Sequence, residues 1–239
     1  MMIGVDPTYN GSIAAWCQEW QDRIAAWVAV QMRSADSGHG IDHVRRVVEN
    51  AKRIGHAEQA DSHIYLPAAW LHDCVVVAKS SPQRKLASAL AAKHAEQFLA
   101  EIAYPENLIG PISHCILSHS FSANIPCESL EAKVVQDSDR LEAVGAIGLA
   151  RCLMTGGAMG QRLYHPTEPF PAVRLPVDTE QSVDHFFAKL LGLQKTMQTL
   201  SGREEARRRS EFLVLFLTQL ADEIGASARD LESALQQVM

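Results

Sequence analysis

Apolar residues recur every three or four positions along most of the chain, which is the spacing of amphipathic helices. The first such stretch follows Ser12, a residue suited to cap the start of a helix. Its apolar positions are Ile13, Trp16, Trp20, Ile24 and Trp27. No alternating pattern longer than a few residues competes with the helical period, so the sequence predicts an all-α protein.

Later segments repeat the same pattern. A second helix is predicted over residues 44–54, with Gly55 as its stop signal, and a third begins after Asp61 and includes residues 66–77. Further helices are predicted from Pro82, Pro105 and Ser129, and over 186–197 and 203–224.

The segment that begins at Ser129 reads as one long helix reaching Met154, with apolar residues on several sides. Its Gly145 and Gly148 are expected to let neighbouring helices approach closely. Four prolines in residues 160–181 predict an irregular excursion, and such loops often act as lids or binding loops. No repeat or domain boundary is visible, so we expect one domain over residues 1–239.

The composition narrows the class of protein. The chain has 239 residues, 47% of them hydrophobic, and a net charge of −6, which argues against a nucleic-acid-coating role. Its five cysteines include no CxxC pair, which favours free, mostly buried thiols in a reducing compartment. Charged residues interrupt the apolar segment 13–32, and no secretory signal precedes it. We therefore expect a cytoplasmic protein without a membrane span.

Several ionisable residues fall at positions that read as buried. His72 and Asp73 end an apolar run, His43 is in phase with the apolar face of its helix, and Asp137 and Asp139 interrupt a buried helix. An isolated buried carboxylate is costly unless it is paired or bound to a metal. A single imidazole in such a place is more often a hydrogen-bonded core group. Together, these sites suggest a shared divalent cation with mixed nitrogen and oxygen ligands.

The order of these residues, His, then His-Asp, then Asp, resembles the HD-domain superfamily of metal-dependent phosphohydrolases. The segments "HGIDHVRRV", "LHD", "KSSPQR", "HSFSA" and "QDSDRLEAVGAIGLAR" are similar to a bacterial branch, the YedJ-like proteins. The resemblance implies a single-domain HD-type helical bundle. Its metal-binding core would span about residues 35–155, with C-terminal helices at about 182–225 packed on it.

The resemblance also implies one divalent ion, of Mn, Mg, Fe, Co, Ni or Zn, with its identity open. Its ligands would be His43, His72, Asp73 and Asp139. Asp137 is the rival for the last place, and Asp139 is favoured because the family's ligand immediately precedes the basic residue. His39, in the preceding loop, is a candidate for a supporting position around the ion.

Such an ion can activate water for attack on a phosphate ester or anhydride. We therefore expect a phosphatase or pyrophosphohydrolase whose substrate is a small phosphorylated molecule, most simply a nucleotide. Asp73 and His119 are the candidate catalytic residues, and Lys79, Arg84 and Arg140 are the candidate phosphate contacts. Lys79 and Arg84 could equally form surface ion pairs, and His119 could be a core histidine.

A second class of function remains open from the sequence. The chain could be a non-enzymatic nucleotide sensor that retains a structural metal. Nucleic acid is a weaker candidate partner because no long basic, aromatic-rich surface is visible. A homodimer is left open.

Overall fold

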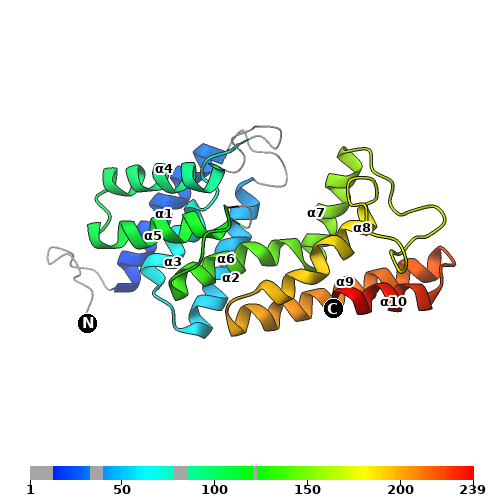
Figure 1. Cartoon of the computed structure of the whole chain (residues 1–239). Helices are drawn as coiled ribbons and strands as arrows, with labels where there is room; N and C mark the ends of the chain where they lie inside the picture. The colour runs from blue at the N-terminus through cyan, green and yellow to red at the C-terminus, as the bar shows by residue number, and fades with distance from the viewer. Residues whose placement is uncertain (1–12, 33–39, 78–85, 121–122) are drawn as a thin grey trace. The chain divides into compact units, whose positions relative to one another are not determined.

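The computed structural model describes residues 13–32, 40–77, 86–120 and 123–239 (Figure 1). Ten α-helices occur in these ranges, with short 3₁₀ segments between some of them. The same ranges hold no strand, only an isolated bridge between Arg162 and Gln181. The predicted all-α fold is confirmed.

The chain divides into two compact units. The first falls within Met1–Lys52 and Ala60–Val135, and the second comprises Arg53–Gln59 and Gln136–Met239. The division falls inside two helices, α2 and α6. The single domain expected over residues 1–239 stays a prediction.

The first unit is built around α3. Its helices are α1 (Ile13–Gln31), most of α2 (Ile41–Glu58), α3 (Ser62–Leu71), α4 (Ala87–Glu101), α5 (Glu106–His119) and the start of α6 (Leu130–Arg140). Helix α3 contacts α1, α4 and α5, and α4 lies along α5 (Figure 1). Ile24, Leu71 and Ile112 are among its fully buried side chains. The core therefore surrounds the helix that ends next to the His72–Asp73 doublet.

The second unit is built around α9. Its elements are η4 (Leu141–Ala143), α7 (Gly145–Ala158), α8 (Ser182–Ala188), η5 (Leu190–Thr196), α9 (Leu200–Glu223) and α10 (Ala228–Val238). Helix α9 contacts α7, η4, η5 and α10. Phe186, Leu213 and Leu217 are completely buried. Helix α10, capped by Ser227, was missed by the sequence reading.

Several predicted helix bounds are wrong. The helix predicted over 186–197 is the end of α8 followed by the 3₁₀ segment η5. The start predicted at Pro82 lies outside the described residues. Helix α2 does not stop at Gly55 but continues to Glu58, and the chain turns at Gln59, where φ is 58°. Gly55 is buried within α2 and does not terminate it. Helix α3 starts after Asp61 as predicted. The Asp61 carboxylate accepts a hydrogen bond from the His63 amide at 2.9 Å. The helix ends at Leu71, before the His72–Asp73 doublet, and the following apolar residues up to 77 are not helical.

The long helix predicted over 129–154 is three elements, α6, η4 and α7. The break between η4 and α7 occurs at Val144, whose backbone is extended, and at Gly145, whose φ of +74° is favourable only for glycine. A side chain there would also meet Arg209 of α9 at 3.1 Å, so this glycine does admit a neighbouring helix. Gly148 is different, because a Cβ would lie 2.3 Å from the backbone of Ala143 in the preceding turn and not against another helix.

Residues 160–181 form the irregular excursion that their prolines predicted. Arg174 fixes it to α8 by donating two hydrogen bonds to the buried carboxylate of Asp184, at 2.5 and 2.7 Å. The amide of Val177 donates to the same carboxylate at 2.6 Å. The excursion is therefore tied to the second unit, and its role as a lid stays a prediction.

Candidate metal centre

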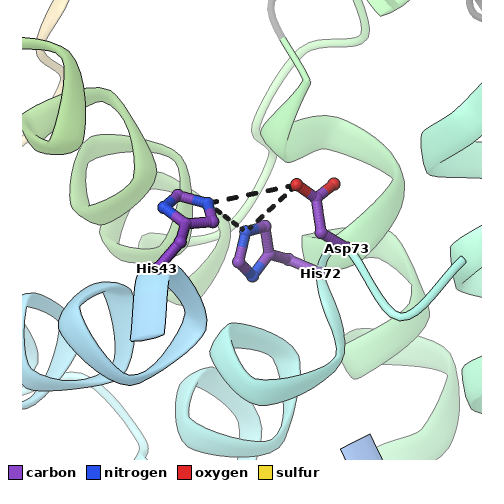
Figure 2. Close-up of side chains that lie close together, drawn as sticks. All are labelled: His43, His72 and Asp73. Atoms are coloured by element: carbon purple, nitrogen blue, oxygen red, sulfur yellow. Dashed lines mark hydrogen bonds and ion pairs between the residues drawn. The ribbon is translucent and has the colours of Figure 1, made fainter. Parts of the chain in front are cut away.

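Three of the predicted ligands converge in the first unit (Figure 2). His43 lies in the first turn of α2, His72 is the C-cap of α3, and Asp73 follows directly. The Nε2 atoms of His43 and His72 are 3.4 Å apart. The Asp73 Oδ2 atom lies 4.0 Å from Nε2 of His43 and 3.7 Å from Nε2 of His72. Two imidazole nitrogens and one carboxylate oxygen therefore face a common point.

The backbone of α3 sets the tautomer of His72. Its Nδ1 lies 2.8 Å from the carbonyl oxygen of Ala69, one turn earlier, and a carbonyl can only accept. The Nδ1 atom therefore carries the proton, and in the neutral ring Nε2 presents its lone pair to the cluster. Metal-binding histidines are typically oriented by a hydrogen bond of this kind.

His119, the last residue of α5, joins the cluster from the other side of Asp73. Its Nδ1 atom lies 2.6 Å from the carbonyl oxygen of Ile116, and its Nε2 atom lies 3.6 Å from Asp73 Oδ1. Its ring stands nearly perpendicular to that of His72, with centroids 5.0 Å apart. Asp73 thus has one carboxylate oxygen beside His43 and His72 and the other beside His119.

The surroundings of Asp73 keep its carboxyl group ionised. Burial acts to raise the pKa of Asp73, but the neighbouring imidazoles of His72, His119 and His43 outweigh it and hold the pKa well below its usual range. His43 and His72 are buried, whereas the side chain of Asp73 is 31% exposed. The carboxylate is therefore the ligand that solvent or a substrate can approach.

The donor set fits a divalent cation. Bonds of about 2.1 Å to one ion place neighbouring ligand atoms roughly 3–4 Å apart, which is the range of the three separations here. Mixed imidazole and carboxylate ligands suit borderline and hard divalent ions. Among the described residues, His43, His72 and Asp73 are the one group of His, Cys, Asp and Glu side chains with this geometry.

The remaining predicted site residues are distributed differently. Lys79, Arg84 and His39 lie outside the described residues. Asp139 lies in the last turn of α6 and belongs to the second unit, so its grouping with the three ligands above stays a prediction. Arg140 donates from Nη1 to the carbonyl oxygen of Thr196 at 2.5 Å, and contact with a substrate stays a prediction for it too.

Asp137, the rival to Asp139, has a structural use for its carboxylate. It accepts hydrogen bonds from the amides of Gln198 and Thr199 and from the Thr199 hydroxyl. Two buried carboxylates were not predicted from the sequence. One is Asp184, which pairs with Arg174. The other is Glu142, three positions after Asp139, which is 2% exposed and lies 3.9 Å from Arg151. Its place in the same apolar segment as Asp137 was the available signal.

The cysteines whose side chains the structure describes match the expected free, mostly buried thiols, and the side chain of Cys17 is not among them. Cys74, Cys115, Cys127 and Cys152 are free, and the first three are buried. Burial raises the pKa of Cys74 and of Cys115 to about 12, so both are protonated at neutral pH. Neither has the electropositive, accessible surroundings of a nucleophilic cysteine.

Comparison with known proteins decides the family. The model of the HD domain matches residues 40–144, which include His43, His72, Asp73 and Asp139. YpgQ of Bacillus subtilis is 34% identical over 208 residues, which cover 85% of this chain and 93% of YpgQ. The chain belongs to the HD superfamily of hydrolases.

Solved HD structures extend the likeness to most of the chain. An HD-superfamily hydrolase from Bacillus thuringiensis superposes with a TM-score of 0.70 at 32% identity, covering 88% of this chain and 100% of that one. YpgQ in complex with ADP superposes with a TM-score of 0.67 at 32% identity, covering 87% and 96%. The predicted HD-type helical fold is confirmed, while membership of the YedJ-like branch stays a prediction. Within the described residues, no helix has the length and apolar character to cross a membrane.

Proposed function

We propose that this HD protein is a metal-dependent phosphohydrolase that acts on a small phosphorylated molecule, most simply a nucleotide. The observation that carries the proposal is the convergence of His43, His72 and Asp73, with separations of 3.4 to 4.0 Å between their donor atoms. The ADP in the complex of YpgQ supports a nucleotide as the ligand class. Cleavage of an ester by a phosphatase or of an anhydride by a pyrophosphohydrolase would both suit this donor set.

His43, His72 and Asp73 would hold one divalent ion, with Asp139 as the fourth ligand that the HD motif implies. Mn, Mg, Fe, Co, Ni and Zn are the candidates. When bound, such an ion lowers the pKa of water and polarises a phosphoryl oxygen. Because Nδ1 of His72 donates to Ala69, Nε2 is the atom of His72 that would bind the ion, and Asp73 would bind it as a carboxylate.

His119 is suited to move a proton. Because Nδ1 donates to the carbonyl oxygen of Ile116, Nε2 is the atom that would hold the transferred proton, and it lies 3.6 Å from Asp73 Oδ1. We propose that His119 donates that proton to an oxygen of the phosphate or of the leaving group. Lys79, Arg84 and Arg140 are proposed to contact phosphate oxygens, since charge stabilisation dominates phosphoryl transfer.

A substrate screen tests the function. The purified protein is incubated with nucleoside mono-, di- and triphosphates and generic phosphate esters, each with Mn²⁺, Mg²⁺, Co²⁺ or Ni²⁺. Release of phosphate identifies a phosphatase, and release of pyrophosphate identifies a pyrophosphohydrolase. Nucleotide binding without either product, with every metal, would replace the enzyme with the alternative, a nucleotide sensor.

Asp73→Ala links the activity to the cluster. We expect this variant to lose bound metal and turnover together, measured by elemental analysis and product release. Asp42→Ala is the matched control, because Asp42 precedes His43 in the same turn but is 80% exposed and pairs with Arg45. Activity that survives in metal-free Asp73→Ala protein would refute the assignment.

A further inference from the structure

The carboxylate of Asp137 is fully buried and accepts hydrogen bonds from Gln198 and Thr199. The amide of Gln198 lies 3.0 and 3.1 Å from its two oxygens. The amide and the hydroxyl of Thr199 donate to Oδ2 at 2.8 and 2.7 Å. Asp137 thus binds the junction between η5 and α9, although it lies only two residues before Asp139.

The groups that donate to Asp137 lie at the start of α9, a helix of 24 residues. Thr199 is its N-cap, and the Thr199 hydroxyl oxygen accepts from the Gly202 amide at 3.0 Å while it donates to Asp137. A helix N-terminus carries unsatisfied amides and a partial positive charge, so a carboxylate there is stabilised. A Cβ on Gly202 would lie 2.5 Å from Asp137 Oδ2 and 2.6 Å from Thr199 Oγ1, so the glycine makes this approach sterically feasible.

Two further bonds tie the same turn of α6 to the same junction. The side-chain amide of Gln198 donates to Gln136 Oε1, and Arg140 donates to the carbonyl oxygen of Thr196. Residues on both sides of Asp139 are therefore held by residues 196–199.

We propose that Asp137 and Thr199 are positioning residues for Asp139. The Asp137–Thr199 bond fixes the turn of α6 from which Asp139 reaches the ion, so that α9 tunes metal affinity without supplying a ligand. The proposal rests on the proposed function, in which Asp139 is the fourth ligand. Supporting groups around a metal ligand commonly change affinity when they are lost, because the ligand is then free to reorient.

Thr199→Val tests the proposal. Valine has nearly the shape of threonine but can neither donate to Asp137 nor cap the Gly202 amide. We expect the Mn²⁺ dissociation constant, measured by titration calorimetry, to rise about tenfold. Thr199→Ser keeps the hydroxyl and should restore wild-type affinity. The visible absorption of bound Co²⁺ should change in Thr199→Val and not in Thr199→Ser, because it reports the ligand geometry.

Glu58→Gln is the control for the stability of the helix end. Glu58 accepts from the Ser201 amide at 2.7 Å, at the same end of α9, but makes this bond from α2 and not from α6. We expect it to lower the melting temperature and leave Mn²⁺ affinity unchanged. Equal weakening of Mn²⁺ binding in both variants would overturn the proposal, since general destabilisation would then explain the effect.

Asp139→Ala separates this proposal from the one on which it rests. If Asp139→Ala weakens Mn²⁺ binding but Thr199→Val does not, the positioning role is wrong and the metal site stands. If Asp139→Ala binds Mn²⁺ like the wild type, the fourth ligand and the positioning role both fall. Should Thr199→Val not fold, Gly202→Ala can be used, because its Cβ would displace the Asp137 carboxylate or the Thr199 hydroxyl. Unchanged Mn²⁺ affinity in that variant would also overturn the proposal.

Discussion

The ion pair of Arg174 and Asp184 offers the sharpest prediction about stability. Asp184 is completely buried in the first turn of α8, and the side chain of Arg174 is 16% exposed. Arg174→Met keeps the aliphatic part of the side chain but removes the charge and both hydrogen bonds to the carboxylate. The variant therefore isolates what the guanidinium contributes to holding residues 160–181.

Removing one partner of a buried ion pair costs about 3–5 kcal/mol, because the other charge is left without compensation. The Val177 amide still donates to Asp184 in the variant, and Arg174 is not fully buried, so the lower end applies. We expect the free energy of unfolding to fall by about 3 kcal/mol. Urea unfolding followed by circular dichroism measures this free energy. An unchanged slope of the free energy of unfolding against urea concentration would show that the variant exposes the same surface on unfolding as the wild type.

Two comparisons make the result interpretable. Arg207→Met removes an exposed pair with Glu211 and should cost less than about 1 kcal/mol. Asp184→Asn combined with Arg174→Met removes the stranded charge and should recover part of the loss. An Arg174→Met variant within about 1 kcal/mol of the wild type would refute the reasoning, since Asp184 would then not need its cation. Hydrogen exchange at the Val177 amide should accelerate in Arg174→Met if the pair anchors the excursion.

Three other outcomes are expected. Gly148→Ala should lower the free energy of unfolding by about 1–3 kcal/mol in urea unfolding, because its Cβ would lie 2.3 Å from the Ala143 backbone. Hydrogen bonds from Arg208 help to lower the pKa of Glu205 from 4.5 to about 2. The ionised Glu205 side chain therefore stabilises the folded protein above pH 4.5, and this stabilisation is lost as the pH falls through 2. Relative to Glu205→Gln, the wild type should lose about 1 kcal/mol over that range after solvent screening, measured by urea unfolding at each pH. Cys74, with a pKa of about 12, should resist a thiol reagent at pH 8 until the protein is unfolded.

Local sequence patterns determined the helical class and most of the helix positions. The helical period of 3.6 residues in the apolar pattern depends only on residues close together in the sequence, so it can be recognised without knowledge of the fold. The helix starts at Asp61 and Pro105 could be predicted for the same reason, because residue preferences at a helix start depend on the first turn alone. The helix end predicted at Gly55 was wrong, because whether a glycine ends a helix or lies within one depends on its tertiary surroundings.

The sequence by itself also brought out His43, His72 and Asp73, because ionisable groups in apolar segments need partners and their HD order is specific. Only the tertiary structure decided what those partners are. It set the tautomer of His72 through Ala69 and placed His119 beside Asp73. It also placed the Asp137 carboxylate in hydrogen-bond contact with the start of α9, where Gln198 lies 61 residues further along the chain. Hydrogen bonds over such separations depend on how helices pack, and packing leaves no periodic trace in the sequence.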